Sequence, residues 1–484
     1  MSDNSGKVLS LAAILRPRQK STLIAACALV AGLVLGSGAI FGWPWTSTTG
    51  AGQTTAHDQG SVRVYKGPLP AGALGGRIDS VTCPTPSHCV GIGDYYTADS
   101  SRVPVLVVTG AGAVWKATAV QLPPGAQSVV GWEPFHLACP AVSTCVGVGS
   151  FDGPLGSGIG GGLLVSGSGG SWKATRAPLP QNSSATPDAI LSAVSCASAA
   201  VCTAIGTYTD ATGGGQGLLL ARTGNSWSPL EVGATLNAVA CAPHADCVIV
   251  GATYGRTAED DNGAILTGNG ASWKPTIAPL PANAAAPPGA GLNAVTCPSA
   301  RMCVAAGYYT DTLGKEEGLL LTGYGASWTA VETANTGALA QVACSSPTSC
   351  VVVGKSTLVL RTGAANSWTT IPIPLPLDAI KNADTFGFNS TSCGPTLTCA
   401  LAGFYETTAK DRKGLIVAGS GRTWTAANVP LAPDESTNSG GPSIQTVTCP
   451  LVMTCLAVGG YQEYTSGSHK TASDQPLIGV INPP

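Results

Sequence analysis

Charged residues are scarce in this chain of 484 residues. Asp, Glu, Lys and Arg together make up 10% of the sequence, whereas about 25% is usual for a soluble protein. The formal net charge is −2, so the molecule has no strong electrostatic field that would attract nucleic acid or a highly charged substrate. We therefore expect no nucleic-acid partner.

Histidines and catalytic motifs are scarce as well. The chain has five histidines, and it contains neither the G-x-S-x-G sequence of many serine hydrolases nor the H-E-x-x-H sequence of zinc proteases. Zinc sites usually combine closely spaced cysteines with further Cys or His ligands, and no histidine recurs at a fixed place beside the repeated cysteines described below. The sequence predicts no metal or other cofactor, and it favours a non-catalytic function without excluding an enzyme.

Glycine, proline and cysteine are abundant instead. The 63 glycines and 35 prolines indicate many short strands and turns rather than helices. The 17 cysteines would be unusual in a reducing cytosol. We therefore expect an all-β protein in an oxidising, extracytoplasmic compartment.

The N-terminal segment has the pattern of a membrane anchor. Four basic residues lie within residues 1–20, and the uncharged run 21–43 has about the length that spans a bilayer. Because the next basic residue is Arg63, the positive-inside rule predicts a cytoplasmic tail at 1–20, a transmembrane helix at 21–43 and an extracytoplasmic linker at 44–60. The protein would then be a single-pass protein of the cell membrane. The alternative is a cleaved signal peptide, since small residues at 36–39 fit a cleavage site.

Sixteen cysteines form a repeat that divides residues 61–484 into eight units. Leaving aside Cys27 in the N-terminal apolar run, they fall into pairs with the spacing C-x5-C. The pairs recur every 45 to 57 residues, which is the length of a four-stranded propeller blade. Glycine follows four residues after every pair, where it indicates a β-bulge or a close backbone approach that lets a neighbouring blade pack tightly. The pairs are 83/89, 139/145, 196/202, 241/247, 297/303, 344/350, 393/399 and 449/455.

Each unit can be divided into four strands, and a tryptophan begins the fourth strand in seven of the eight units. The eighth unit ends after its third strand, at residues 475–482, whereas residues 61–70 resemble a fourth strand and precede the first unit. Pairing these two segments would close the ring and leave little exposed sheet edge. The fold prediction is an all-β, eight-bladed β-propeller of four-stranded blades over residues 61–484, closed by an N-terminal strand and preceded by one transmembrane helix.

Each C-x5-C pair brackets the turn between the first and second strands of a unit. Residues opposite each other in antiparallel strands have Cα atoms about 4.5 to 5.5 Å apart, within the range that a disulfide accepts. We therefore expect a disulfide within each hairpin, contributing roughly 2 kcal/mol by closing a short loop. Metal-bound cysteines and free thiols are the alternatives.

The two faces of the predicted ring carry different kinds of connection. Turns between first and second strands and between third and fourth strands are short and uniform, whereas the other connections vary in length and hold much of the charge. Variable loops on a rigid scaffold are the usual place for binding. On that face Trp132, Phe135 and His136 could form an exposed binding anchor, or could pack beneath their own loop. Phe386 is a further candidate, because it has no counterpart in the other units.

Two resemblances bear on the fold. The glycine-rich turns at 166–172 and 267–273 resemble the Asp-box of sialidase-like propellers, although they are one residue shorter and have Ser168 or Asn269 in place of the aspartate. In that family the box is a structural turn, so the resemblance implies the fold and not the activity. The whole repeat also looks like that of bacterial exported β-propeller proteins of unassigned function.

The function that we predict is non-catalytic binding of a protein or a cell-surface glycan by a monomeric propeller. A sialidase-like, glycan-active hydrolase is the alternative, and a central pocket lined by paired carboxylates or by arginines would favour it. If the N-terminal segment is cleaved, the same propeller would be exported in soluble form.

Overall fold

The computed structural model describes most of residues 62–482 together with two short segments, 8–9 and 57–59. The residues left out between 62 and 482 are 100–102, 131–132, 155–159, 244, 256–259, 332, 334, 363–366, 396–397, 433–440, 452–453 and 465–471.

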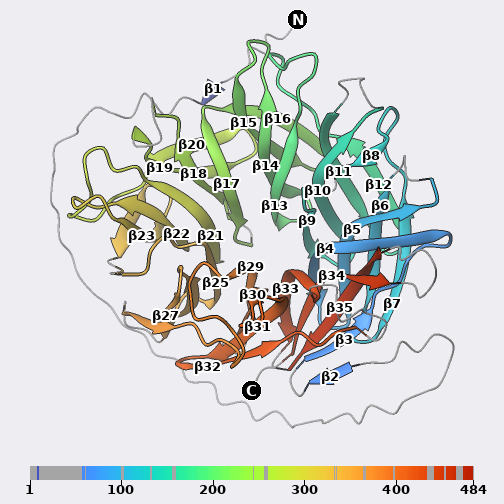
Figure 1. Ribbon diagram of the computed structural model, residues 1–484. Coiled ribbons are helices and arrows are strands. Elements are labelled where there is room, and N and C mark those ends of the chain that lie inside the picture. Colours follow the sequence, from blue (N-terminus) through green and yellow to red (C-terminus); the bar gives the residue numbers. More distant parts are fainter. Residues whose placement is uncertain are drawn as a thin grey trace, which may run out of the picture.

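Eight sheets of antiparallel strands form a ring, as Figure 1 shows. In seven of them four strands follow one another in chain order. The first strands of neighbouring blades contact one another all around the ring, so the first strand of each blade is innermost and the fourth is outermost. The prediction of an all-β, eight-bladed propeller is confirmed for the described residues.

The first four blades are formed by residues 73–277. They are blade 1 with β4 (Ala73–Thr85), β5 (His88–Thr97), β6 (Val105–Ala111) and β7 (Val114–Val120); blade 2 with β9 (His136–Ala141), β10 (Thr144–Asp152), β11 (Gly160–Ser168) and β12 (Ser171–Arg176), plus the short β8 (Ser128–Val129) beside β10; blade 3 with β13 (Ile190–Ser198), β14 (Val201–Thr209), β15 (Gly215–Thr223) and β16 (Ser226–Val232); and blade 4 with β17 (Ala234–Cys241), β18 (Cys247–Thr253), β19 (Gly263–Asn269) and β20 (Ser272–Ile277).

The remaining blades follow along the chain, and the last one also takes a strand from the N-terminal side. They are blade 5 with β21 (Gly291–Ser299), β22 (Met302–Thr310), β23 (Glu316–Tyr324) and β24 (Ser327–Val331); blade 6 with β25 (Gln341–Ser346), β26 (Ser349–Val353), β27 (Thr357–Thr362) and β28 (Trp368–Pro372); blade 7 with β29 (Phe386–Cys393), β30 (Cys399–Glu406), β31 (Arg412–Ser420) and β32 (Thr423–Asn428); and blade 8 with β33 (Ser443–Leu451), β34 (Thr454–Tyr464), β35 (Ala472–Ile481) and β3 (Val62–Lys66).

The strand β3 closes the ring as predicted. It pairs antiparallel with β35, with Val62 opposite Ile481 and Val64 opposite Gly479. The side chains of Val62 and Val64 are 1% and 0% exposed, so this pairing also completes the core of blade 8. In Figure 1 the blue β3 lies beside the red β35.

The predicted cytoplasmic tail (1–20), transmembrane helix (21–43) and linker (44–60) lie outside the described residues, apart from two short strands, and they stay predictions. β1 (Val8–Leu9) pairs in parallel with the outer strand β16, and β2 (His57–Gln59) pairs with β3. Within the described part of the chain, no helix is long and apolar enough to cross a membrane.

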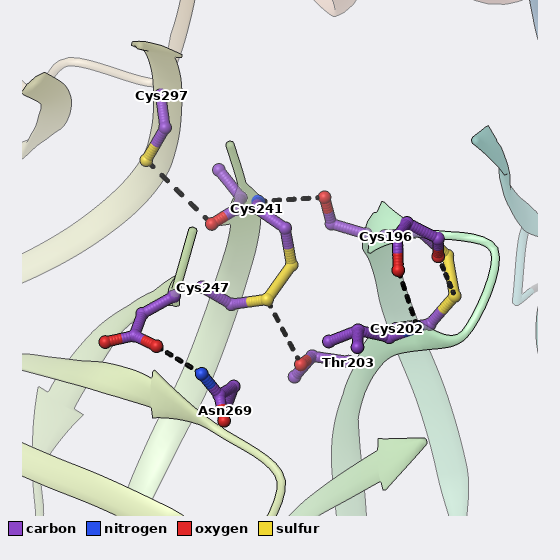
Figure 2. Close-up of a disulfide and its surroundings, with 12 residues drawn as sticks. Cys196, Cys202, Thr203, Cys241, Cys247, Asn269 and Cys297 are labelled. Carbon is purple, nitrogen blue, oxygen red and sulfur yellow. Dashed lines mark hydrogen bonds between the residues drawn. A yellow bond between two sulfur atoms is a disulfide. The ribbon is translucent and has the colours of Figure 1, made fainter. Parts of the chain in front are cut away.

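Every C-x5-C pair forms a disulfide, as predicted, with Cα atoms 3.9 to 4.1 Å apart. These bonds lie against the neighbouring blades. Figure 2 shows the Cys241–Cys247 disulfide of blade 4, where Thr203 of blade 3 contacts the Cys247 sulfur at 3.4 Å. The main-chain N–H of Cys241 also donates to Ser195 Oγ of blade 3 at 3.0 Å. The disulfide hairpins therefore contribute to the contacts between blades as well as to the register within each blade.

The repeated glycine explains a bulge in the first strand. In blade 4, Gly251 lies opposite Leu236, and the register shifts between Leu236 and Ala238. A Cβ atom at Gly251 would collide with the carbonyl oxygen of Thr235. The predicted bulge and the predicted close backbone approach are thus both present, and the approach is to the blade's own first strand. Asn237 is the bulge residue that this arrangement leaves unpaired within the sheet.

Side-chain amides at or beside the bulge join the innermost strands of successive blades. Each donates to a main-chain carbonyl at the start of the next blade, so that the unpaired carbonyl is satisfied. The bonds run from Asn237 to Leu292 (2.9 Å), from Asn293 to Leu339 (3.0 Å), from Gln341 to Phe388 (2.9 Å) and from Asn389 to Ile444 (2.7 Å).

Candidate functional site

The two faces of the ring differ as the sequence predicted. The loop face carries the connections between second and third strands and those between successive blades, and the disulfide face carries the disulfide hairpins and the turns before the fourth strands. Tyrosines at the ends of second strands tether the loop-face connections. Their hydroxyl groups donate from Tyr208 to Asn182 (3.0 Å), from Tyr309 to Asn283 (2.9 Å) and from Tyr405 to Asp378 (3.1 Å).

Pocket A is a cavity of about 470 Å³ on the loop face between blades 2 and 3. The buried Phe151 and the side chain of Leu179 form apolar walls, and the glycine run 160–162 leaves space at the start of β11. Arg176 stands over the Phe151 ring, with its Cζ atom 4.7 Å from the ring centroid. Its Nη2 atom donates to the carbonyl oxygen of Pro124 at 3.1 Å, which fixes the guanidinium at the rim.

Pocket B is a cavity of about 330 Å³ on the same face between blades 6 and 7. Its walls include Ile373, Leu375 and Phe386, and Lys381 contributes a positive charge. The ring of Phe386 packs edge to face on Phe388, with centroids 6.2 Å apart. Phe386, a binding candidate from the sequence, therefore lines a cavity.

The two pockets occupy equivalent positions in the repeat. In pocket A the N–H of Ala177 donates to the carbonyl of Gly162 at 2.8 Å, and in pocket B the N–H of Ile373 donates to Ser356 at 3.1 Å. A Pro-Leu-Pro sequence follows in both cases. The two junctions are four blades apart, so the pockets lie on opposite sides of the ring.

The charges of the two pockets are alike. Arg176 lines pocket A and Lys381 lines pocket B, and no acidic side chain is among the described residues that line either one. A cation beside apolar walls suits a ligand that presents an apolar group next to a negative charge. Arg176 is better placed than Lys381 for this purpose, because its planar guanidinium is already held against an aromatic ring.

The predicted anchor of Trp132, Phe135 and His136 is not an exposed cluster as far as the structure describes it. Trp132 lies outside the described residues. Phe135 is 2% exposed, and its ring fills the space over Gly149, so it is part of the core, as the packing alternative expected. Burial lowers the pKa of His136, which favours its neutral form at pH 7.

The register of blade 2 gives the reason for the burial of Phe135. His136 pairs with Val148 without a bulge, so Phe135 comes opposite Gly149. In blade 5 the core residue Leu292 lies opposite Gly307 in the same way. Phe135 thus takes the place of Leu292, one residue nearer to the cysteine because the bulge residue is missing.

A buried charged cluster in blade 1 was not found by sequence reasoning. The Arg77 Nε atom lies 3.1 Å from Asp79 Oδ1 and 3.1 Å from Asp94 Oδ2. The N–H of Phe135 from blade 2 donates to Asp79 Oδ2 at 3.2 Å. Burial raises the pKa of Asp79 to about 7, although Arg77 opposes the change, and burial also raises the pKa of Asp94. A signal was present in the sequence, since Asp79 stands where three other units have asparagine.

This cluster has carboxylates and an arginine, the groups that a glycan hydrolase would need, but their geometry is structural. Asp79 is 3% exposed, and Arg77 and the Phe135 N–H already occupy both of its oxygens. A general acid or base has to reach a substrate atom within hydrogen-bond distance. The cluster therefore gives no support to the hydrolase alternative.

Comparisons with known proteins find no matching family and several distant structural neighbours. No protein-family model matches the sequence, and no curated protein matches it. The acylaminoacyl peptidase of Pyrococcus horikoshii is similar in structure, with a TM-score of 0.44 and 7% identity over 81% of this chain. The chain spans 58% of the length of that peptidase.

Two further solved structures are propellers of other kinds. The β-propeller domain of the trilobed protease from Pyrococcus furiosus has a TM-score of 0.42 and 6% identity, covering 75% of this chain and 98% of that domain. The sialidase of Trypanosoma rangeli has a TM-score of 0.32 and 10% identity, covering 84% of this chain and 92% of the sialidase. The structural neighbours thus include propeller proteases and sialidases, and no activity is transferred from them.

Proposed function

We propose that the protein is an extracytoplasmic β-propeller that binds a protein or a cell-surface glycan through its loop face, without catalysing a reaction. The observation that carries this proposal is the recurrence of one pocket type, an apolar cavity beside a cation, at two equivalent blade junctions. Pocket A is the main site, because it is the larger cavity and its Arg176 is fixed by two contacts.

The rigidity of the blades supports a binding function. The connections tethered by Tyr208 and Tyr405 hold the walls of pockets A and B in place before a ligand arrives, so little conformational entropy is lost on binding. The ligand that fits pocket A presents an apolar surface next to a carboxylate, sulfate or phosphate group. Such a pair of groups occurs both on protein surfaces and on acidic glycans.

Site-specific photo-crosslinking on native cells tests this function. A photoreactive amino acid replaces Ala185, an exposed residue that lines pocket A, and the control replaces Val114, which is 80% exposed on the disulfide face. We expect a discrete product from position 185 that is lost when Arg176→Glu is added. Equal products from positions 185 and 114, or a product that persists in Arg176→Glu, would exclude loop-face binding at pocket A.

The extracytoplasmic location is supported by the disulfides, which persist in oxidising compartments. A chain anchored through residues 21–43 would keep Val8 and Leu9 in the cytoplasm, away from their partner strand β16, so the anchored form cannot contain the β1 pairing. A thiol-labelling reagent that does not cross membranes distinguishes the cases when single cysteines replace Ser5 and Ser226. Labelling at 226 but not at 5 in a protein that stays with the membrane supports the anchored form, and release of a protein that lacks residue 5 supports signal cleavage. Labelling at both positions supports an exported chain that keeps the β1 pairing.

A further inference from the structure

A third cavity lies on the disulfide face and has a different chemistry from pockets A and B. Pocket C has a volume of about 370 Å³ and lies between blades 2 and 3. Its lining is polar and includes Trp172, Lys173 and Arg222. Five hydroxyl side chains complete it, namely Ser143, Thr144, Ser166, Ser168 and Ser171.

Arg222 breaks the repeat at this position. In five other blades the residue that pairs with the fourth-strand tryptophan is glycine, and a Cβ atom at Gly167, for example, would lie 2.8 Å from the Trp172 Cα atom. In blade 3 Arg222 pairs with Trp227 instead. The glycines are Gly110, Gly167, Gly268, Gly323 and Gly419.

Blade 6 provides a comparison, because it also has an arginine at this place. Arg361 pairs with Trp368, is 8% exposed, and stands over the Trp368 ring with its Cζ atom 5.8 Å from the centroid. That arginine is buried against its own blade, and its Nη1 atom also contacts the Met302 sulfur of blade 5 at 3.7 Å. Arg222 is more exposed and reaches the junction with blade 2, where it forms one wall of pocket C.

One nitrogen of the Arg222 guanidinium donates a hydrogen bond, and another has no acceptor. Its Nε atom donates to the carbonyl oxygen of Gly224 at 2.8 Å. Its Nη1 atom is buried and has no hydrogen-bond partner among the described residues. A buried donor without an acceptor is unfavourable, so a turn of the guanidinium that brings Nη1 to an anionic acceptor in the cavity would relieve this cost.

The charge of pocket C is positive. Lys173 and Arg222 come from neighbouring blades, and no acidic residue is among the described residues that line the cavity. The indole N–H of Trp172 already donates to Gly169 at 2.9 Å, so the ring offers its carbon surface to a ligand. Hydroxyl groups around the cavity can exchange hydrogen bonds with the hydroxyl groups of a sugar.

We propose that pocket C binds an acidic saccharide, with its carboxylate or sulfate group between Lys173 and Arg222 and a sugar ring against Trp172. An arginine can bind such an anion through two parallel hydrogen bonds. Hydroxyl groups and an indole surface select a sugar over a bare anion. This site lies on the face opposite to pocket A and does not depend on the function proposed for the loop face.

Isothermal titration calorimetry of the full chain tests the site. The probes are a uronic-acid trisaccharide, a sulfated trisaccharide, a neutral trisaccharide and inorganic sulfate. We expect the uronic-acid or the sulfated probe to bind, with an affinity that falls as salt is raised, and the neutral probe not to bind. The probe that binds then identifies the source of the negative charge.

Two variants test the residues. Arg222→Gly restores the glycine of the other blades, so it should fold, and Lys173→Ala removes the second cation. Each should raise the dissociation constant at least tenfold. The matched control is Lys274→Ala, because Lys274 in blade 4 has the same place in its strand but lies outside pocket C, and it should leave the constant unchanged. Binding of inorganic sulfate alone, equal binding of the neutral probe, or an affinity that survives Arg222→Gly would overturn the proposal.

Discussion

The bulge residue of the innermost strand bonds to the next blade in two different ways around the ring. In blades 4, 5 and 7 the bulge residue is an asparagine that donates to the next blade, as Asn293 does to Leu339 at 3.0 Å. In blade 1 the bulge residue is Asp79, which accepts the N–H of Phe135 and binds Arg77. The direction of the hydrogen bond is therefore reversed, and an ionisable group replaces a neutral one.

The difference between asparagine and Asp79 shows which part of the ring has a stability that depends on pH. A neutral amide bonded to a carbonyl keeps its strength at every pH, whereas a buried carboxyl group is easier to hold in its protonated form. Blade 1 lies next to blade 8, where the chain closes on itself, and Thr446 of blade 8 donates to the Asp79 carbonyl at 2.6 Å. The titratable carboxyl group therefore lies at the junction of blades 1 and 2, and the main-chain carbonyl of the same residue contacts blade 8 at the closing junction.

The largest expected effect comes from breaking the closure itself. Val64→Asp places a charge at a position that is 0% exposed, which costs several kcal/mol when the charge has no partner. We expect loss of the cooperative thermal transition, or a large decrease in its midpoint, by circular dichroism. Arg63→Gln on the exposed side of the same strand is the control and should unfold like the parent protein.

The second largest expected effect is the change in stability with pH that Asp79 causes. Because the pKa of Asp79 is raised to about 7 in the folded state, the folded protein binds more protons than the unfolded chain between about pH 4 and 7. The contribution of Asp79 to the free energy of unfolding is therefore full at low pH and is lost as the pH rises through this range. The change from pH 5 to 7.5 should be about 2 kcal/mol.

Asp79→Asn should remove most of this slope while keeping an acceptor for Phe135. The measurement is the free energy of unfolding in urea at several pH values. A smaller slope of the same sign should remain, because the pKa of Asp94 is raised too. An unchanged slope in the variant would show that Asp79 is not the group that titrates.

The third effect concerns the junctions where an asparagine amide donates to the next blade. Asn293→Leu removes the amide donor and leaves the Leu339 carbonyl without its partner, which should lower the free energy of unfolding by about 1 to 2 kcal/mol at every pH. The control is Gln445→Leu in blade 8, because among the described residues the Gln445 amide donates to Ser443 of its own strand and to no other blade. A pH-dependent loss in Asn293→Leu would contradict the comparison.

The smallest expected loss of stability tests whether Thr446 of blade 8 and Asp79 of blade 1 act together. Thr446→Val removes one hydroxyl bond to blade 1 and should cost about 1 kcal/mol. If the closing junction acts as a unit, the losses in Thr446→Val and Asp79→Asn should not add up in the double variant. Strict additivity would mean that Thr446 and Asp79 contribute independently.

Much of the fold could be predicted from the sequence, because its repeated residues have fixed physical roles. The C-x5-C pairs define hairpins, and the tryptophans mark the outer strands, where the indole of Trp273 donates to Gly270 at 3.0 Å. The pairing of residues 61–70 with 475–482 followed from counting strands. These features depend on contacts within one blade, which a local pattern can encode.

The site was harder to predict, because it depends on contacts between blades. Phe135 was placed in a loop since the missing bulge residue shifts it by one position from Leu292. Pockets A and B arise from packing at blade junctions. The Pro-Leu-Pro sequences at 178–180 and 374–376 do not distinguish these two junctions, because 68–70 and 279–281 have the same sequence. Arg222 was visible as an exception to the glycine pattern, but only the register made its meaning clear.

The pairing of β3 with β35 has a consequence for folding during synthesis. Val62 and Ile481 pair across almost the whole described chain, so the strand that closes the ring is synthesised first and its partner last. At usual rates of translation β3 has to wait tens of seconds for β35. During this time blade 8 is incomplete, and the apolar side of β3 is open to other partners. A nascent chain of this kind needs a chaperone or a partly folded stack of blades to protect one short strand.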